Sequence, residues 1–354
     1  MVVRAFITHK QAELFADCQD RFGVNPDTKS IAVSDGMGST WQQKIWAQLL
    51  VDTYTDSTDW CPSNETIKPL CQTWRSKVAD FIQNLKKTNA PENMIYRNER
   101  NFAEGRSAGT TFVGIRFNGN EWNGSVLGDS CLIEWDGNEV KFNTSQDSET
   151  FDSYPDYFDS DASKEGKGVP KPIEGVLTEG KCLLLVSDPF SEFLLEHSKQ
   201  GNIAEYVQQL LSLTTHDDFE TLVYEWRKEG MHNDDTTLVI VENDNSEILT
   251  TKHPDNIVEM VEKEKMSHNF ANDTVEKATS LLESPLQGKS VVIENFVVVQ
   301  NIEKAFIDEF QIEYQRCLQK KFPKQMGKLK YKWTQKAVEK ALTILFEKYS
   351  IIKK

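Results

Sequence analysis

The chain has 354 residues, of which 55 are Asp or Glu and 40 are Lys or Arg, giving a formal net charge of −15. This length allows two or three globular domains of about 100 to 200 residues each. The 38% hydrophobic content excludes a disordered chain, and the apolar runs are all too short for a membrane helix, which needs about 20 residues.

The start of the chain, Met1–Leu14, has no sustained apolar stretch that would indicate a secretory signal, so we expect a cytoplasmic protein. The six cysteines are scattered without a C-x-x-C pair, which favours reduced thiols over disulfides or a thiolate zinc site. Residues 1–250 carry 41 acidic and 22 basic residues, whereas residues 251–354 carry 14 and 18. An acidic body of this kind repels nucleic acid, and the change near residue 250 indicates a domain boundary.

Short apolar runs within the first 245 residues predict β-strands. These runs are Val2–Thr8, Ser30–Ser34, Thr110–Phe117, Glu121–Leu127, Cys131–Trp135, Lys181–Ser187 and Thr236–Glu242. Helical spacing of apolar residues predicts a helix capped by Ser39 and further helices over Ile67–Thr88, Ile203–Leu213 and Asp218–Lys228. The polar turns at 118–120 and 136–138 are short, which favours antiparallel pairing of the strands that they join.

Acidic residues stand at the ends of four predicted strands: Asp35, Asp129, Asp188 and Asp234. Each of them alone has an ordinary interpretation as a turn former or a strand-end cap. A carboxylate at the end of a buried strand must be paired, hydrogen-bonded, protonated or bound to a metal. If several converge, their oxygens are natural ligands for hard cations such as Mg²⁺ or Mn²⁺.

The motifs around these residues resemble those of the metal-dependent Ser/Thr protein phosphatases of the protein phosphatase 2C type, over about residues 2–243. They comprise Cys18-Gln19-Asp20, VSDGMGS at 33–39, SAGTTFVGI at 107–115, VLGDS at 126–130, LLLVSD at 183–188 and NDDTTLVIV at 233–241. Their order and spacing are those of the family. Thr8-His9 ahead of the Cys-Gln-Asp element is similar to a bacterial-type branch.

The resemblance implies an α+β fold, an αββα sandwich of two central, mainly antiparallel sheets flanked by helices. It places a phosphatase domain at 1–245, with a flap at about 140–177 that borders the active site. The acidic flap favours basic phosphopeptides. We expect residues 250–354 to form a mostly helical C-terminal appendage, with helical patterns at 302–318 and 333–349 and strand-like runs at 290–293 and 296–299.

The resemblance also implies a centre for two Mn²⁺ or Mg²⁺ ions, with a third, weaker ion in some members. Asp35 would bridge two ions and the Gly36 carbonyl would hold one of them. The remaining ligands would be Asp20, Asp188 and Asp234, with Asp129 and Glu192 at the third ion. A hydroxide between the ions would hydrolyse phosphoserine and phosphothreonine of a phosphoprotein substrate by in-line attack on phosphorus.

One departure from the family concerns phosphate binding. Members of the family usually carry an Arg five positions before the residue equivalent to Asp20, where this chain has Phe15. His9 and Lys10 are our candidates to supply the missing positive charge, and we group them with Asp35 and Asp20 as catalytic residues. The ordinary interpretation is that Lys10 is solvated and His9 caps a strand.

Two further departures lie near the centre. Met37 occupies a position where some relatives have a His proposed as general acid, and Pro189 replaces the usual Gly after Asp188, which changes the local backbone. These departures motivate an alternative function, a catalytically weak pseudophosphatase that binds phosphoproteins or acts as a scaffold. A phosphatase for small phosphate esters is a third candidate.

For the apolar stripe at 333–349, packing within the protein is the ordinary interpretation, and docking of a partner such as a cognate Ser/Thr kinase is the alternative.

Overall fold

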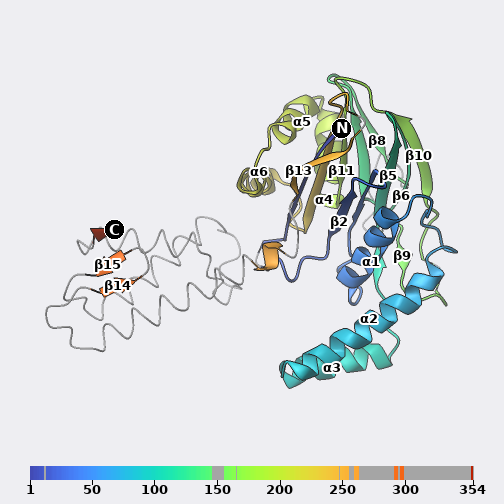
Figure 1. Cartoon of the computed structure of the whole chain (residues 1–354), viewed down its shortest axis with the longest axis vertical. Coiled ribbons are helices and arrows are strands. Elements are labelled where there is room, and N and C mark those ends of the chain that lie inside the picture. Colours follow the sequence, from blue (N-terminus) through green and yellow to red (C-terminus); the bar gives the residue numbers. More distant parts are fainter. Residues whose placement is uncertain are drawn as a thin grey trace. The chain divides into compact units, whose positions relative to one another are not determined.

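The computed structural model describes residues 1–11, 13–145, 155–164, 166–246, 248–254, 259–262, 291–293, 296–298 and 352–353 (Figure 1). The chain divides into two compact units. The first contains Met1–Lys10 and Asp17–Asn256, and the second contains Gln11–Ala16 and Ile257–Lys354. Among the described residues, none of the helices has the length and apolar character that crossing a membrane requires.

The first unit is built on two β-sheets. The larger sheet has the order β13 (Thr250–Pro254), β1 (Val2–Thr8), β12 (Thr236–Glu242), β11 (Cys182–Val186), β7 (Cys131–Trp135) and β8 (Val140–Asn143). The smaller sheet has the order β10 (Lys171–Val176), β6 (Glu121–Leu127), β5 (Phe112–Asn118), β3 (Ser30–Ser34) and β2 (Arg21–Asn25). All neighbours pair antiparallel except β13 and β1, which are parallel.

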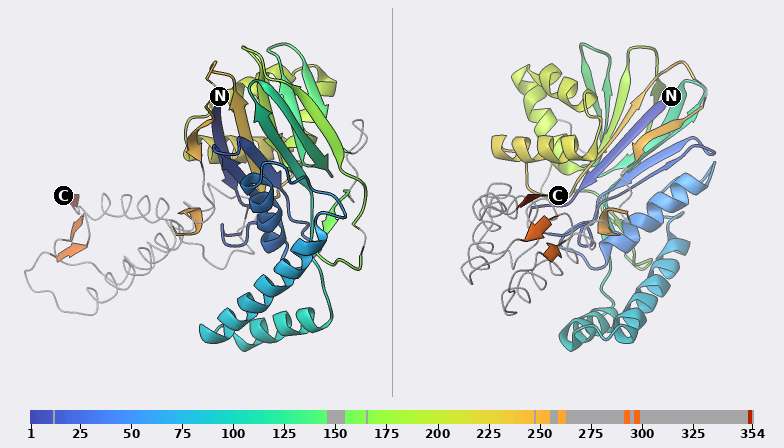
Figure 2. Two further views of the ribbon diagram at one scale, coloured as in Figure 1. Left: turned by 45° about the vertical axis from the view of Figure 1, so that its right-hand side comes forward. Right: turned by 60° about the vertical axis from the view of Figure 1, so that its left-hand side comes forward.

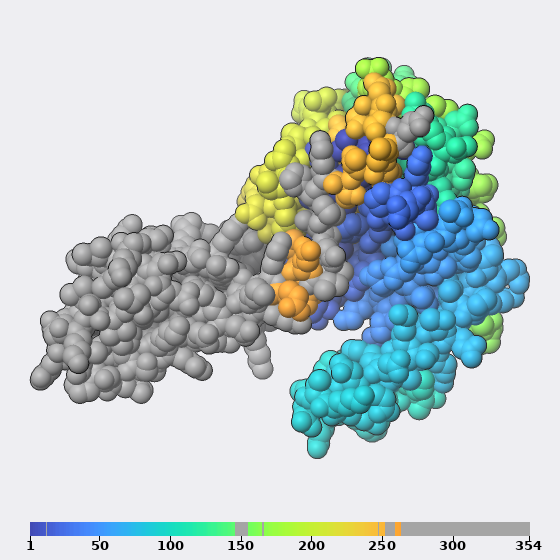
Figure 3. All heavy atoms as spheres, viewed as in Figure 1, coloured from blue at the N-terminus to red at the C-terminus, as the bar shows by residue number. Residues whose placement is uncertain are grey.

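Helices cover the outer face of each sheet (Figure 2). On the smaller sheet lies α1 (Gln43–Asp56), followed by α2 (Lys68–Lys87) and α3 (Glu92–Ala103). On the larger sheet lie α4 (Asp188–Gln200), α5 (Ile203–Leu211) and α6 (His216–Glu229). In the space-filling view the α2–α3 hairpin stands out from the rest of the first unit (Figure 3). The layers are helix, sheet, sheet and helix, which confirms the predicted αββα sandwich.

Three apolar clusters follow these layers, because successive side chains of a strand point to opposite faces of its sheet. In β11, Leu183 and Leu185 lie in the cluster between the two sheets, whereas Leu184 and Val186 lie in the cluster beneath α4–α6. The third cluster joins α1 and α2 to the smaller sheet and includes the fully buried Trp46. Strands buried on both faces read as continuous apolar runs, and the sequence shows this pattern.

Several elements differ from the sequence-based expectation. The predicted cap Ser39 does not start a helix. The helix α1 begins only at Gln43, and the residue before it, Gln42, has a left-handed conformation with φ 57°. The expected strand Thr110–Phe117 is divided at Thr111 between β4 (Gly109–Thr110) and β5. β4 pairs with β9 (Phe158–Asp159), so part of the predicted flap is a buried strand. Residues 146–154 of the flap lie outside the described residues.

The described strands of the second unit form an antiparallel sheet in the order β14 (Val291–Ile293), β15 (Phe296–Val298) and β16 (Ile352–Lys353). The strand-like runs predicted at 290–293 and 296–299 are therefore confirmed within these bounds. The predicted helices at 302–318 and 333–349 lie outside the described residues.

Candidate metal centre

A cavity of about 960 Å³ opens in the first unit, beside the ends of β3, β11 and the segment that leads into β12. Its wall combines the loop after β3, Asp129 in the loop between β6 and β7, one face of α4 from Asp188 to Gln200, and the segment from Glu229 to Asp234. Six of the seven predicted metal-binding residues line it: Asp35, Gly36, Asp129, Asp188, Glu192 and Asp234. The structure therefore brings together side chains that are up to 199 positions apart in the sequence.

Asp35 follows β3 in a loop that the β4 segment holds. Its carbonyl accepts a hydrogen bond from Thr111 N at 2.9 Å, and Gly36 forms a bridge with Thr110. Gly36 is required by close packing, because a Cβ atom at this position would lie 2.8 Å from Gln43 Cγ and 3.0 Å from the Gln19 carbonyl oxygen. A larger residue would push the loop away from the segment that carries Asp20.

Asp188 is the first residue of α4, and Pro189 is the second. Proline suits this position, because the amides of the first helical turn have no partner within the helix. The Asp-Pro sequence therefore starts a helix directly at the predicted metal-binding residue. Ser187 accepts a hydrogen bond from Thr237 N at 2.9 Å, and Ser191 donates one to the Asp129 carbonyl at 2.7 Å. These bonds tie α4 to the neighbouring β12 and to the segment with Asp129.

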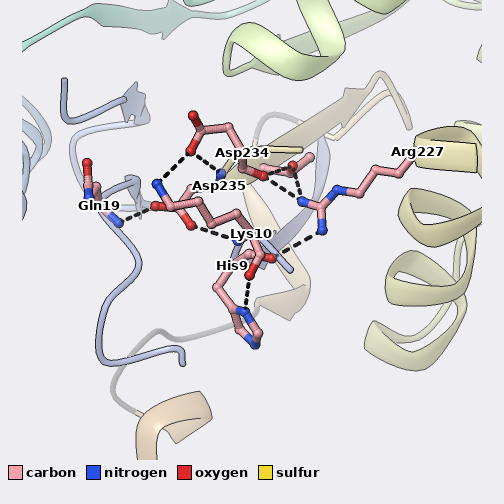
Figure 4. A network of polar contacts seen from close by, with 7 residues as sticks. His9, Lys10, Gln19, Arg227, Asp234 and Asp235 are labelled. Atoms are coloured by element: carbon pink, nitrogen blue, oxygen red, sulfur yellow. Dashed lines mark hydrogen bonds and ion pairs between the residues drawn. The ribbon is translucent and has the colours of Figure 1, made fainter. Parts of the chain in front are cut away.

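The buried Asp235 joins three segments of the chain at the edge of the centre (Figure 4). Its two carboxylate oxygens accept hydrogen bonds from Lys10 N at 2.9 Å and Gln19 N at 2.7 Å. On the other side of this network, Arg227 of α6 donates to the carbonyl oxygens of His9 and Asp234. The loops that carry Asp20 and Asp234 are therefore held by charged hydrogen bonds, which are stronger than neutral ones.

The predicted phosphate-binding residues His9 and Lys10 belong to this network, and neither lines the cavity. The Lys10 ammonium lies 3.2 Å from Oδ1 of Asp234, and Nδ1 of His9 contacts the Lys10 carbonyl at 2.8 Å (Figure 4). The Lys10 side chain is 22% exposed. Lys10 thus pairs with a predicted metal ligand.

Asp20, the seventh predicted ligand, is completely buried beside Asp35. Its Oδ2 accepts a hydrogen bond from the Thr237 hydroxyl at 2.8 Å. Burial and the nearby charge of Asp235 raise the pKa of Asp20 to about 7. Oδ1 of Asp20 accepts no hydrogen bond from the residues that the structure describes, and the same is true of Oδ1 of Asp129.

The carboxyl groups of the centre raise one another's pKa values. Burial and the charges of Asp20, Asp188 and Asp129 raise the pKa of Asp35 well above its usual range. Burial likewise raises the pKa of Asp188 strongly and that of Asp129 to about 7. None of the described residues that line the cavity is Lys or Arg. Converging carboxylates with unpaired buried oxygens fit divalent cations, which neutralise their repulsion and occupy their lone pairs.

Two residues near the centre were not predicted from the sequence. His232 lines the cavity, and one of its ring nitrogens belongs to a cluster with carboxylate oxygens of Asp188 and Asp234, all within 4.8 Å of one another. Arg227 fixes the backbone of the same loop. A lone His in a loop and an Arg on an amphipathic helix give no distinctive sequence pattern; only the spacing of His232 two residues before Asp234 offered a signal.

A family model described as protein phosphatase 2C matches residues 9–227. No curated protein matches the chain.

Solved structures that resemble the chain include the S. agalactiae serine/threonine phosphatase, with 15% identity, a TM-score of 0.42 and coverage of 68% of this chain and 99% of that chain. PppA, a key regulatory component of T6SS in Pseudomonas aeruginosa, has 16% identity and a TM-score of 0.43, covering 68% and 98%. The Mycobacterium tuberculosis serine/threonine phosphatase PstP/Ppp has 18% identity and a TM-score of 0.39, covering 68% and 98%.

Proposed function

Because the chain belongs to the protein phosphatase 2C family of serine/threonine phosphatases, we propose that it is an active, metal-dependent phosphatase for phosphoserine and phosphothreonine in proteins. The observation that carries this proposal is the convergence of carboxylates around one cavity, with buried oxygens of Asp20 and Asp129 that lack partners among the described residues. A module that only binds phosphoproteins would gain nothing from such a costly cluster of like charges.

The residues that would hold two Mn²⁺ or Mg²⁺ ions are Asp20, Asp35, Gly36 through its carbonyl, Asp188 and Asp234, with Asp129 and Glu192 for a third ion. When bound, such ions lower the pKa of a water molecule and neutralise the phosphate oxygens, so that hydrolysis needs no phosphoenzyme. Asp35 is the best candidate to bridge the two ions, because the charges of three other carboxyl groups, those of Asp20, Asp188 and Asp129, act on its own. Ser187, Thr237 and Asp235 keep these carboxylates in place.

Lys10 is our candidate for contacting the substrate phosphate, together with His9. Its ammonium pairs with Asp234 at 3.2 Å, and a long, flexible side chain of this kind exchanges one anionic partner for another at little cost. We further propose that 1–245 is the catalytic domain and that 250–354 forms an appendage, except that β13 (Thr250–Pro254) at its start belongs to the larger sheet of the first unit.

Phosphate release from a phosphothreonine peptide tests the proposed function. We expect turnover by the purified full chain with Mn²⁺ or Mg²⁺ and none with EDTA, because the carboxylates alone repel a phosphate dianion. A folded protein that binds the ions and releases no phosphate from any phosphopeptide would favour the pseudophosphatase instead. Hydrolysis of an aryl phosphate without phosphopeptide turnover would favour a phosphatase for small esters.

The cavity continues beyond the predicted metal ligands along α4 and the end of α6, where its wall stays acidic. Glu196 and Glu229 line this part together with Phe193 and Met231. Since no Lys or Arg is among the described lining residues, the wall attracts Lys and Arg side chains that flank a phosphorylated residue. We propose basic phosphopeptides as the preferred substrate class.

The double variant Glu196→Gln and Glu229→Gln should lower kcat/KM for a peptide with Arg residues beside the phosphothreonine by about three- to tenfold, since two exposed charge pairs are lost. Turnover of an aryl phosphate should not change. Glu205→Gln is the matched control, because Glu205 is exposed on α5 and does not line the cavity. Equal peptide kinetics in the double variant and the wild-type protein, at low salt, would refute this preference.

A further inference from the structure

His232 lies in the short loop between α6 and β12, and both sides of this loop are anchored. On one side, Gly230 ends α6 with φ 125°, a conformation that favours glycine, and Met231 is buried at 4% exposure. On the other side, Arg227 holds the Asp234 carbonyl. Between these anchors the exposed His232 side chain lines the cavity. Because both sides of the loop are anchored, its backbone holds the His232 imidazole at the cavity wall.

The distance between His232 and two predicted metal ligands suits a shared ion. A ring nitrogen of His232 and one oxygen each of Asp188 and Asp234 lie within 4.8 Å of one another. Opposite ligands of an ion with bonds of about 2.1 Å are about 4.2 Å apart, so only a small inward movement of the exposed imidazole would be needed for all three groups to share one ion. Glu192 also lies near the ring: burial raises the pKa of its carboxyl group, and His232 offsets part of that rise.

We propose that His232 is a direct ligand of the ion held by Asp188 and Asp234, and that this imidazole makes the centre prefer Mn²⁺ over Mg²⁺. The inference rests on the proposed function, because it adds a ligand to the same centre. Mg²⁺ takes oxygen ligands in a strict octahedral shell, whereas nitrogen ligands suit transition-metal ions. Seven carboxylate and carbonyl groups alone give no basis for choosing Mn²⁺; the imidazole supplies one.

Calorimetric titration of the metal-free full chain with MnCl₂ and, separately, MgCl₂ tests the proposal without relying on activity. For His232→Ala we expect the affinity for Mn²⁺ to fall at least about tenfold and the affinity for Mg²⁺ to fall much less. His232→Asp should restore an oxygen ligand, so it should bind both ions and lose the preference for Mn²⁺. In crystals of the Mn²⁺-loaded protein, a His232 nitrogen should lie about 2.0–2.3 Å from an anomalous scattering peak.

His197→Gln is the matched control. His197 lines the same cavity, but its Nδ1 lies 3.1 Å from Oδ1 of Asn202 and its ring stacks on Tyr206 at 3.7 Å. This variant should keep the wild-type affinities for both ions.

Two outcomes would overturn the proposal in different ways. If His232→Ala binds Mn²⁺ as tightly as the wild-type protein does, and both remain active, His232 is not a ligand and the proposed function stands. If the folded wild-type protein binds neither Mn²⁺ nor Mg²⁺, the proposed function fails together with this inference.

Discussion

Replacing Asp35 by Asn should lower kcat for a phosphothreonine peptide by at least about 10³-fold. Removal of one group that stabilises the transition state electrostatically lowers kcat by about 10²- to 10³-fold, so we expect the upper end of this range. Asn has nearly the same shape, but it lacks the charge that two cations would share. Asp35 occupies the middle of the cluster, where the charges of Asp20, Asp188 and Asp129 all act on it. The effect should therefore exceed that of replacing Glu192, which is exposed at the edge of the cavity.

The same variant should be more stable than the wild-type protein in EDTA at pH 8. Without cations, burial and like charges make an ionised Asp35 carboxylate unfavourable in the folded protein. A neutral amide at this position carries no such charge, so the folded state no longer bears that free-energy cost. Lower activity with higher metal-free stability separates loss of function from loss of fold. Asp136→Asn is the control, because Asp136 lies in the exposed turn between β7 and β8, away from the cavity. Wild-type turnover by Asp35→Asn would exclude this centre as the site of reaction.

The sequence predicted the buried part of the fold well, because strands buried on both faces have an unmistakable composition. The bounds of β1, β3 and β12 agree with the expected ranges to the residue. The edge strands β2 and β10 were missed. β10 contains Lys171 and Pro172, and proline is tolerated only where no neighbour needs its amide, so edge strands read as loops.

The same limit applies to the helices. α2 has an apolar stripe with Trp74, Val78 and Ile82, and its predicted range, 67–88, exceeds the observed one by a single residue at each end. α4 was missed, since Asp188-Pro189 reads as a break unless the proline is known to occupy the first turn. The start of α1 was placed at Ser39 because Ser is a good cap, but in the structure the residues 36–41 form the turn beside the cavity.

For the candidate site, the strand pattern pointed to four carboxylates, those of Asp35, Asp129, Asp188 and Asp234. The resemblance to the phosphatase family added Asp20, Gly36 and Glu192, and the structure places all of these residues at or beside one cavity. The sequence could not predict contacts set by tertiary structure alone. The pairing of Lys10 with Asp234 spans 224 positions, and the contact of Arg227 with the His9 carbonyl spans 218. Neither the direction of the Lys10 ammonium nor the approach of His232 to Asp188 leaves a local pattern.

The metal-free protein should lose stability as the pH rises from about 5 to 8, the opposite of what paired carboxylates produce. Asp20 and Asp129 have an ordinary pKa of 3.8, and in the folded protein both values are raised to about 7. Between these values the folded state binds more protons than the unfolded state, so the free energy of unfolding falls with increasing pH.

Differential scanning calorimetry in EDTA at pH 5, 6, 7 and 8 measures this effect, and we expect the midpoint temperature to fall by on the order of 5–10 °C. Mn²⁺ binds the ionised carboxylates of the folded state, so it should raise the midpoint more at pH 8 than at pH 5. Asp129→Asn should flatten the pH dependence in EDTA, because one of the two groups no longer titrates. A wild-type midpoint in EDTA that stays constant or rises over this range would show that Asp20 and Asp129 ionise in the folded protein as easily as in the unfolded chain, and the carboxylates would then need no cation to coexist.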